Sequence, residues 1–90
     1  MTPEDIASRI EAFVRAHFAV APTDATFARS AALFELGYVD SVGVVELLAF
    51  LAEEFGVEIT DAELLSEDFA TINGIAGVVH ALRERADRAA

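Results

Sequence analysis

Apolar residues recur every three or four positions in three separate segments of this 90-residue chain, a spacing that places them on one face of an α-helix. The stretch Val57 to Ile59 alternates like a strand, but it is too short to stand alone and has no second strand to pair with. A capping-box pattern at Thr60 and Glu63 adds a short helix before the last long one. The sequence therefore predicts an all-α fold, a small antiparallel four-helix bundle with three principal helices and one short helix.

The first long helix begins with a strong start signal. Thr2 can cap it, Pro3 suits its first position, and Asp5 stands where a capping box needs an acid. The helix should end between His17 and Ala19, because Pro22 disfavours helical backbone at the residue before it. Its core stripe is expected to consist of Ile6, Ile10, Phe13, Val14 and Phe18.

The second long helix is predicted from Ser41 to Phe55, with Asp40 as its cap and Gly56 as its stop. Helical spacing predicts a wide buried face made of Val45, Leu47, Leu48, Leu51, Ala52 and Phe55. Four other residues should form a mixed apolar and acidic surface beside Ser41, namely Val42, Glu46, Ala49 and Glu53.

The remaining segments connect and complete the bundle. Residues 20–38 lack a sustained period, so we expect a long connection whose apolar side chains reach the core, namely Phe27, Leu33, Phe34 and Leu36. The short helix should lie within residues 62–69 and be anchored by Leu64, Leu65 and Phe69. Thr71 is expected to cap the last long helix, whose core stripe comprises Ile72, Ile75, Val79, Leu82 and Ala86. Gly74 and Gly77 should allow a neighbouring helix to approach it closely.

Acidic residues dominate the charge of the chain. Sixteen acids against six arginines and no lysine give a formal net charge of −10. Between Ser30 and Leu82 there are ten acids and no arginine or lysine, the acids being Glu35, Asp40, Glu46, Glu53, Glu54, Glu58, Asp61, Glu63, Glu67 and Asp68. Such a field repels nucleic acids and anionic membranes and attracts basic protein surfaces. We therefore expect protein partners, no nucleic acid and no membrane insertion, although the acids could also serve solubility alone.

Several classes of function lack the residues they need. The absence of cysteine excludes disulfides, thiolate metal sites and cysteine nucleophiles. His17 and His80 are the only imidazoles, and no spacing pairs either with Ser41, so we expect no metal site and no enzyme activity. No apolar run approaches the roughly 20 residues that span a bilayer, and the acidic N-terminus is unlike a signal peptide. We predict a single domain over residues 1–90, monomeric and cytoplasmic.

The stretch from Leu36 to Val42 resembles the acyl carrier protein family, whose motif is Asp-Ser-Leu before an acidic amphipathic helix. Here the motif reads Asp40-Ser41-Val42. The resemblance continues through residues 45–48 and 51–59 and into the helix that starts at Thr71. Freestanding carriers are the most similar, and residues 37–41, 43–48 and 67–71 are similar to the D-alanyl carrier subgroup.

This resemblance implies that Ser41 carries a 4′-phosphopantetheine arm derived from coenzyme A, which holds acyl or aminoacyl intermediates as thioesters. It implies a non-catalytic phosphoprotein of biosynthesis, with Asp40 as the motif residue and the helix from Val42 to Phe55 as the partner-docking surface. The implied partners are a phosphopantetheinyl transferase, an acyl- or aminoacyl-loading ligase, and a downstream acyltransferase or synthase. The residues by themselves leave an alternative, because Asp-Ser is a common helix cap. The alternative is an acidic helical interaction module that docks a basic partner without a prosthetic group.

Overall fold

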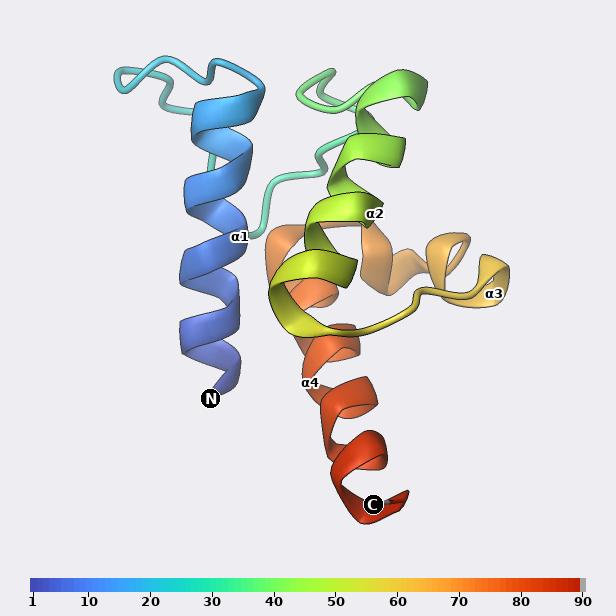
Figure 1. Cartoon of the computed structure of the whole chain (residues 1–90). Helices are drawn as coiled ribbons and strands as arrows, with labels where there is room; N and C mark the ends of the chain where they lie inside the picture. The colour runs from blue at the N-terminus through green and yellow to red at the C-terminus, as the bar shows by residue number, and fades with distance from the viewer. Residues whose placement is uncertain (90) are drawn as a thin grey trace.

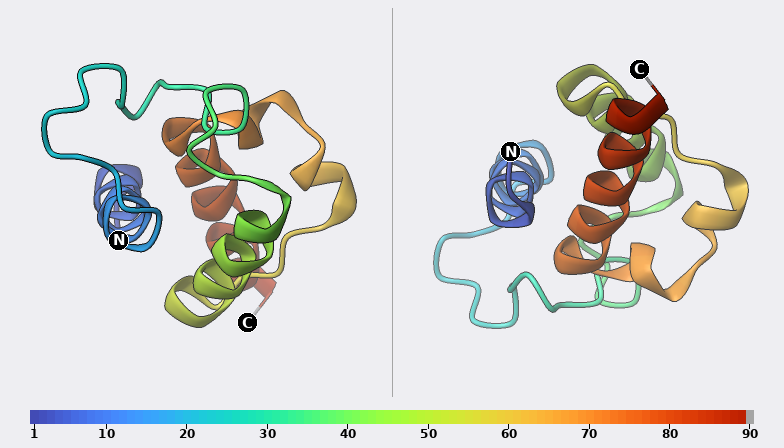
Figure 2. Two further views of the ribbon diagram at one scale, coloured as in Figure 1. Left: turned by 90° about the horizontal axis from the view of Figure 1, so that it is seen from above. Right: turned by 90° about the horizontal axis from the view of Figure 1, so that it is seen from below.

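The computed structural model describes residues 1–89, which form four α-helices and one 3₁₀ helix and contain no strand. The elements are α1 (Pro3–His17), α2 (Ser41–Phe55), α3 (Asp61–Leu64), η1 (Glu67–Ala70) and α4 (Ile72–Ala89). Helix α1 runs opposite to α2 and α4, and α1 and the α3–η1 segment lie on opposite sides of α2 and α4 (Figures 1 and 2). The predicted small helical bundle is confirmed, with η1 as an addition to the short third helix.

Local capping signals determine where the helices begin and end. Thr2 Oγ1 accepts a hydrogen bond from the backbone N–H of Asp5 at 3.1 Å, and the Asp5 carboxylate accepts one from Thr2 N–H at 3.1 Å. At α2, Asp40 Oδ1 accepts from Gly43 N–H at 2.7 Å, while Gly56 ends the helix in the left-handed conformation with φ of 65°. These contacts satisfy amides and carbonyls that a helix end leaves unpaired, so the predicted bounds of α1 and α2 are confirmed.

The same kind of contact starts the two later helices. Thr60 and Glu63 form the predicted capping box of α3, and Thr71 Oγ1 accepts from Gly74 N–H at 2.9 Å at the start of α4. A Cβ atom at Gly74 would lie 1.7 Å from the carbonyl oxygen of Asp68, so the close backbone approach predicted there is confirmed. Gly77 has nothing within 4 Å of such a Cβ, so the same prediction for Gly77 is wrong.

The hydrophobic core lies between the three long helices and is closed by side chains of the connections. Its fully buried large residues are Ile6, Ile10 and Val14 of α1, Leu47 and Leu51 of α2, Ile72, Ile75 and Val79 of α4, Leu33 and Val39 of the first connection, and Phe69 of η1. Burying each such side chain contributes about 1.5–3 kcal/mol. In the last predicted stripe Leu82 is only partly buried and Ala86 is exposed, because α4 runs on beyond the other helices (Figure 1).

The buried face of α2 differs from the predicted one. Val45 is 64% exposed and Ala52 is exposed, whereas the buried positions follow an i, i+4 line through Gly43, Leu47, Leu51 and Phe55. Gly43 lies against the ring of Phe18, and a Cβ there would lie 2.6 Å from Phe18 Cε1. A glycine at this position lets the end of α1 approach α2, and this contact turns the line through Gly43 toward the core. Sequence periodicity did not predict that this line starts at Gly43, because glycine carries no apolar side chain.

The long connection between α1 and α2 runs along the outside of the bundle without forming a helix (Figure 2). Phe27 and Leu33 reach the core as predicted, but Phe34 and Leu36 are exposed. Arg29 fixes the connection to α1, because its guanidinium donates to Glu11 Oε1 at 2.8 Å, to Glu4 Oε1 at 2.7 Å and to Ser8 Oγ at 2.9 Å.

The segment after α2 also departs from one expectation. The link predicted at residues 57–59 forms neither helix nor strand, and Phe69 of η1 is buried. Leu65 was expected to anchor this segment, but it is 85% exposed, since it lies at the C-cap of the four-residue helix α3 where the chain turns away from the core. None of the described helices combines the length and the apolar character needed to cross a membrane.

Candidate functional site

Ser41 is the first residue of α2 and is exposed to solvent. The chain that leads to it is held firmly, because the backbone N–H groups of Tyr38 and Val39 both donate to the carbonyl of Leu33, at 2.9 and 3.2 Å. Val39 is buried two residues before Ser41, and Asp40 caps the helix between them. The hydroxyl is therefore presented from a fixed backbone and not from a loose loop.

The start of α2 tolerates an added negative charge beside Ser41. The first turn contains no acid, and Asp40, the one carboxylate next to the serine, directs Oδ1 into the helix toward Gly43 N–H. The amides of a first helical turn point outward and the helix dipole has its positive end there, so both favour an anion. A phosphate ester formed at Ser41 would be electrostatically compatible with this position.

An open hollow of about 440 Å³ adjoins Ser41. Its lining combines the polar Asp40 and Ser41 with the apolar side chains of Phe34, Val39, Val44 and Leu64. A group attached through a phosphate and continuing into an arm with apolar segments suits this lining, with the phosphate at the helix start and the arm along the apolar wall. The residues present thus fit a phosphopantetheine group, and Ser41 is the hydroxyl available to hold it.

The four residues predicted to form a surface beside Ser41 are all exposed on α2, namely Val42, Glu46, Ala49 and Glu53. Val45 joins them, although the sequence placed it in the core. Val42 is 68% exposed, so two valines in the first turns of α2 each have more than half of their surface in solvent. Single exposed apolar residues are ordinary, but a pair next to a candidate modification site suits a surface that other proteins contact.

Comparison with known families shows which family the chain belongs to. A family model described as "Phosphopantetheine attachment site" matches residues 14–79 of the chain, a region that includes Ser41 and the whole of α2. The chain belongs to the phosphopantetheine attachment site family. Its members bind a 4′-phosphopantetheine prosthetic group and act as carriers, so the family resemblance found in the sequence is confirmed. A search of curated proteins finds no match.

Two acids of α2 pair with side chains from outside residues 30–82, the stretch without arginine or lysine. His17 of α1 contacts the carboxylate of Glu46 through Nε2, and Arg9 Nη1 lies 2.6 Å from Glu54 Oε1. Both partner side chains come from α1, which is distant in sequence, so charge counting within residues 30–82 missed them. Among the described residues Glu53 forms no ion pair, which makes it the free acid on this part of α2.

A hydrogen-bonded cluster holds the connection just before the carrier motif, and the sequence gave no signal for it. Tyr38 Oη donates to Asp24 Oδ2 at 2.8 Å, and Thr26 Oγ1 donates to Asp24 Oδ1 at 2.7 Å. Both bonds lower the pKa of the Asp24 carboxyl below its ordinary value, and the bond from Thr26 has the larger effect. Because Tyr38 lies three residues before Ser41, the cluster helps to fix the approach to the site.

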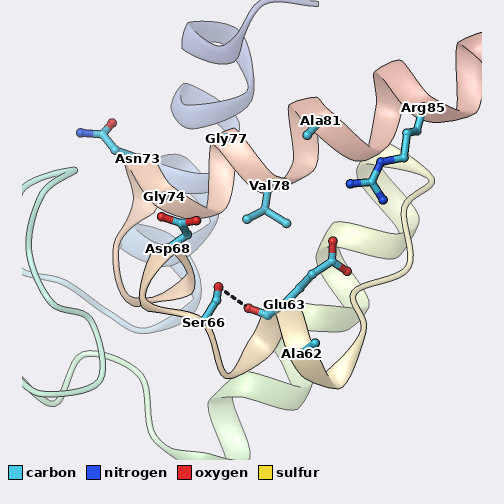
Figure 3. Close-up of a pocket in the computed structure, with 10 residues that line it drawn as sticks. All are labelled: Ala62, Glu63, Ser66, Asp68, Asn73, Gly74, Gly77, Val78, Ala81 and Arg85. Atoms are coloured by element: carbon cyan, nitrogen blue, oxygen red, sulfur yellow. Dashed lines mark hydrogen bonds between the residues drawn. The ribbon is translucent and has the colours of Figure 1, made fainter.

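A second hollow lies between the α3–η1 segment and α4 (Figure 3). It measures about 560 Å³ and shares no lining residue with the hollow at Ser41. Glu63 and Arg85 flank it from opposite walls (Figure 3). The Glu63 carboxylate accepts the capping-box bonds of Thr60. These bonds lower the pKa of Glu63, the one from the Thr60 backbone N–H most strongly. Across residues 1–89, no group of three potential ligands could hold a metal ion.

The two histidines engage carboxylates and not Ser41. His17 binds Glu46 as described, and His80 Nε2 lies 3.5 Å from Glu84 Oε1 one turn along α4. No histidine contacts the serine hydroxyl among the described residues.

Proposed function

We propose that Ser41 is the attachment residue for 4′-phosphopantetheine and that the chain is a single carrier domain, residues 1–90, for acyl or aminoacyl groups. The observation that carries the proposal is the exposed Ser41 hydroxyl at the start of α2, beside an apolar hollow and inside the matched region. When attached, the arm supplies a terminal thiol on which the cargo is held as a thioester. The chain itself contributes the oxygen of the phosphate ester and the surface that enzymes meet.

Each residue of the motif has its own task in this proposal. Asp40 keeps the first turn of α2 ordered and leaves the outward amides beside Ser41 available to the ester's negative charge. Val39 anchors the preceding backbone in the core. Phe34, Val44 and Leu64 offer the arm an apolar wall beside the helix.

The exposed side of α2 is the proposed docking surface, formed by Val42, Val45, Glu46, Ala49 and Glu53. The partners that would meet it are a phosphopantetheinyl transferase, an acyl- or aminoacyl-loading ligase, and a downstream acyltransferase or synthase. The proposed carrier is a freestanding, monomeric, cytoplasmic protein similar to the D-alanyl subgroup. Its net charge of −10 supports basic docking surfaces on those enzymes.

Intact mass spectrometry tests the attachment. The chain is incubated with coenzyme A and a broad-specificity phosphopantetheinyl transferase, alongside the Ser41→Ala and Ser30→Ala variants. Ser30 is a matched control because it is exposed and lies outside α2. Wild type and Ser30→Ala should gain the mass of one arm and Ser41→Ala should gain none. An arm on Ser41→Ala would show that the attachment site is elsewhere, and no gain on any of the three would favour an interaction module.

A further inference from the structure

His17, the last residue of α1, contacts Glu46 in the second turn of α2. The contact joins His17 Nε2 to Glu46 Oε2, and since a carboxylate only accepts, the imidazole nitrogen donates. Both side chains remain about half exposed, so another molecule can reach the same carboxylate. Glu46 lies five residues after Ser41, and a protein that reaches the serine also passes this pair.

Aromatic rings from both helices hold the imidazole in place. The His17 ring stacks on Phe13 with ring centres 4.8 Å apart and meets the edge of Phe18 at 5.0 Å. Phe13 in turn stacks on Phe50 of α2 at 4.1 Å. The stack fixes the ring before any partner arrives, so the Nε2 contact with Glu46 costs little additional ordering.

The three glutamates of α2 that follow Ser41 therefore differ in availability. Glu46 is held by His17 and Glu54 by Arg9, whereas Glu53 has no ion pair among the described residues. Arg15, the arginine of α1 nearest to His17 in the sequence, pairs with Glu11 and so does not take the place of His17 at Glu46. The first acid of α2 after Ser41 is thus occupied by a residue of the chain itself.

We propose that His17 competes with a basic side chain of the docking enzyme for Glu46 and so weakens docking at Ser41, an inference that rests on the proposed function. An arginine or lysine of the enzyme can pair with Glu46 only after it displaces Nε2. The free energy that Glu46 contributes to docking is therefore the difference between its interaction with the enzyme and its interaction with His17. A residue at the end of α1 thus sets how strongly the enzyme binds α2.

The test measures the initial rate at which Ser41 is loaded by a broad-specificity phosphopantetheinyl transferase with coenzyme A at low salt. His17→Phe keeps a ring for the stack and removes the donor to Glu46. It should load about two- to fivefold faster than wild type, the range expected when one exposed contact to a carboxylate is released, and added salt should reduce the gain because it screens the enzyme's basic side chain from Glu46. His80→Phe is the matched control, because His80 forms a similar pair with Glu84 on α4, and its rate should equal that of wild type.

A second variant shows whether the gain depends on Glu46. Glu46→Gln should load more slowly than wild type, and His17→Phe should have no effect in the Glu46→Gln background. A rate for folded His17→Phe at or below that of wild type would overturn the inference, as would a gain that persists in Glu46→Gln. If His17→Phe does not fold, an unchanged rate for Glu46→Gln alone overturns it. A wild-type chain that is never loaded at Ser41 refutes the proposed function itself. Equal loading rates for wild type and His17→Phe refute only the competition between His17 and the enzyme.

Discussion

Ser41 owes its position to neighbours that fix the backbone on both sides of it. Val39 is buried before it, and the Asp40 carboxylate bonds to Gly43 N–H after it. The serine hydroxyl contributes little to this arrangement, because Asp40 and not Ser41 is the cap. The free energy of unfolding of Ser41→Ala should therefore lie within about 1 kcal/mol of wild type. Urea denaturation measures it, and a much larger loss would mean that Ser41 has a structural task.

Two glycines of α4 give opposite predictions for the same substitution. A Cβ at Gly74 would clash with the carbonyl of Asp68, whereas Gly77 faces open space. Gly74→Ala should lower the free energy of unfolding by about 2 kcal/mol or more, because the backbone of η1 has to move. Gly77→Ala should raise it by up to about 1 kcal/mol, since alanine favours the helix. Thermal unfolding of the two variants separates these outcomes, and equal effects would contradict the contact between η1 and α4.

Helix α2 has a buried line and an exposed side that two substitutions distinguish. Phe55 is buried at the end of the line, and Phe55→Ala should cost about 3–5 kcal/mol, a large part of the stability of a small domain. Val45→Ala is the control, and its effect should stay within about 0.5 kcal/mol because Val45 faces solvent. A larger loss for Val45→Ala in denaturant unfolding would contradict the observed orientation of α2, in which Phe55 is buried and Val45 is exposed.

The ion-pair cluster between α1 and the long connection makes stability depend on pH. Arg29 first, and then Arg15, lower the pKa of Glu11 below its ordinary value of 4.5 through side-chain hydrogen bonds. The unfolded chain therefore binds a proton at Glu11 more readily than the folded chain does. The stabilisation from Glu11 is present above that ordinary value and is lost as pH falls through the lower folded value. Unfolding measured from about pH 6 to about pH 3 should show a smaller decline for Glu11→Gln than for wild type, and parallel curves would contradict the linkage.

At the scale of the whole molecule, acids and arginines are concentrated on different helices. Helix α2 has three acids and no arginine, whereas three of the six arginines lie on α4, which runs toward the opposite end of the molecule and also contains two acids (Figure 1). Such a distribution orients an approaching basic surface as well as attracting it. Helix α2, with Ser41 at its start, should therefore meet basic enzymes first.

Charge reversal tests whether this recognition is local. Glu46→Lys with Glu53→Lys should slow loading of Ser41 at low salt, and added salt should narrow the difference from wild type. Glu58→Lys with Glu67→Lys changes the net charge equally at two exposed acids outside α2. The loading rate of this control pair should fall less. Equal slowing by both pairs would indicate attraction by net charge alone, without a docking role for the exposed side of α2.

The sequence predicted what depends on neighbouring residues and missed what depends on distant ones. Helix ends followed from local caps such as Thr2, Asp40 and Gly56, which act within three or four positions of themselves. The orientation of α2 depends on Phe18 packing against a glycine 25 positions later, since residue 18 meets residue 43. Pairing of Glu46 with His17 likewise depends on how α1 is placed in the bundle. Local periodicity contains no information on either contact.

The attachment of the arm to Ser41 is the central claim, and peptide mapping of the loaded wild-type chain tests it most directly. The chain has four serines, and cleavage after arginine leaves three of them, Ser30, Ser41 and Ser66, in one peptide from Ser30 to Arg83. Fragmentation of this peptide assigns the added mass to one serine. We predict that every fragment containing Ser41 carries the arm and that fragments ending at Asp40 or beginning at Val42 do not. An arm located on Ser30 or Ser66, or no arm on this peptide, would contradict the account.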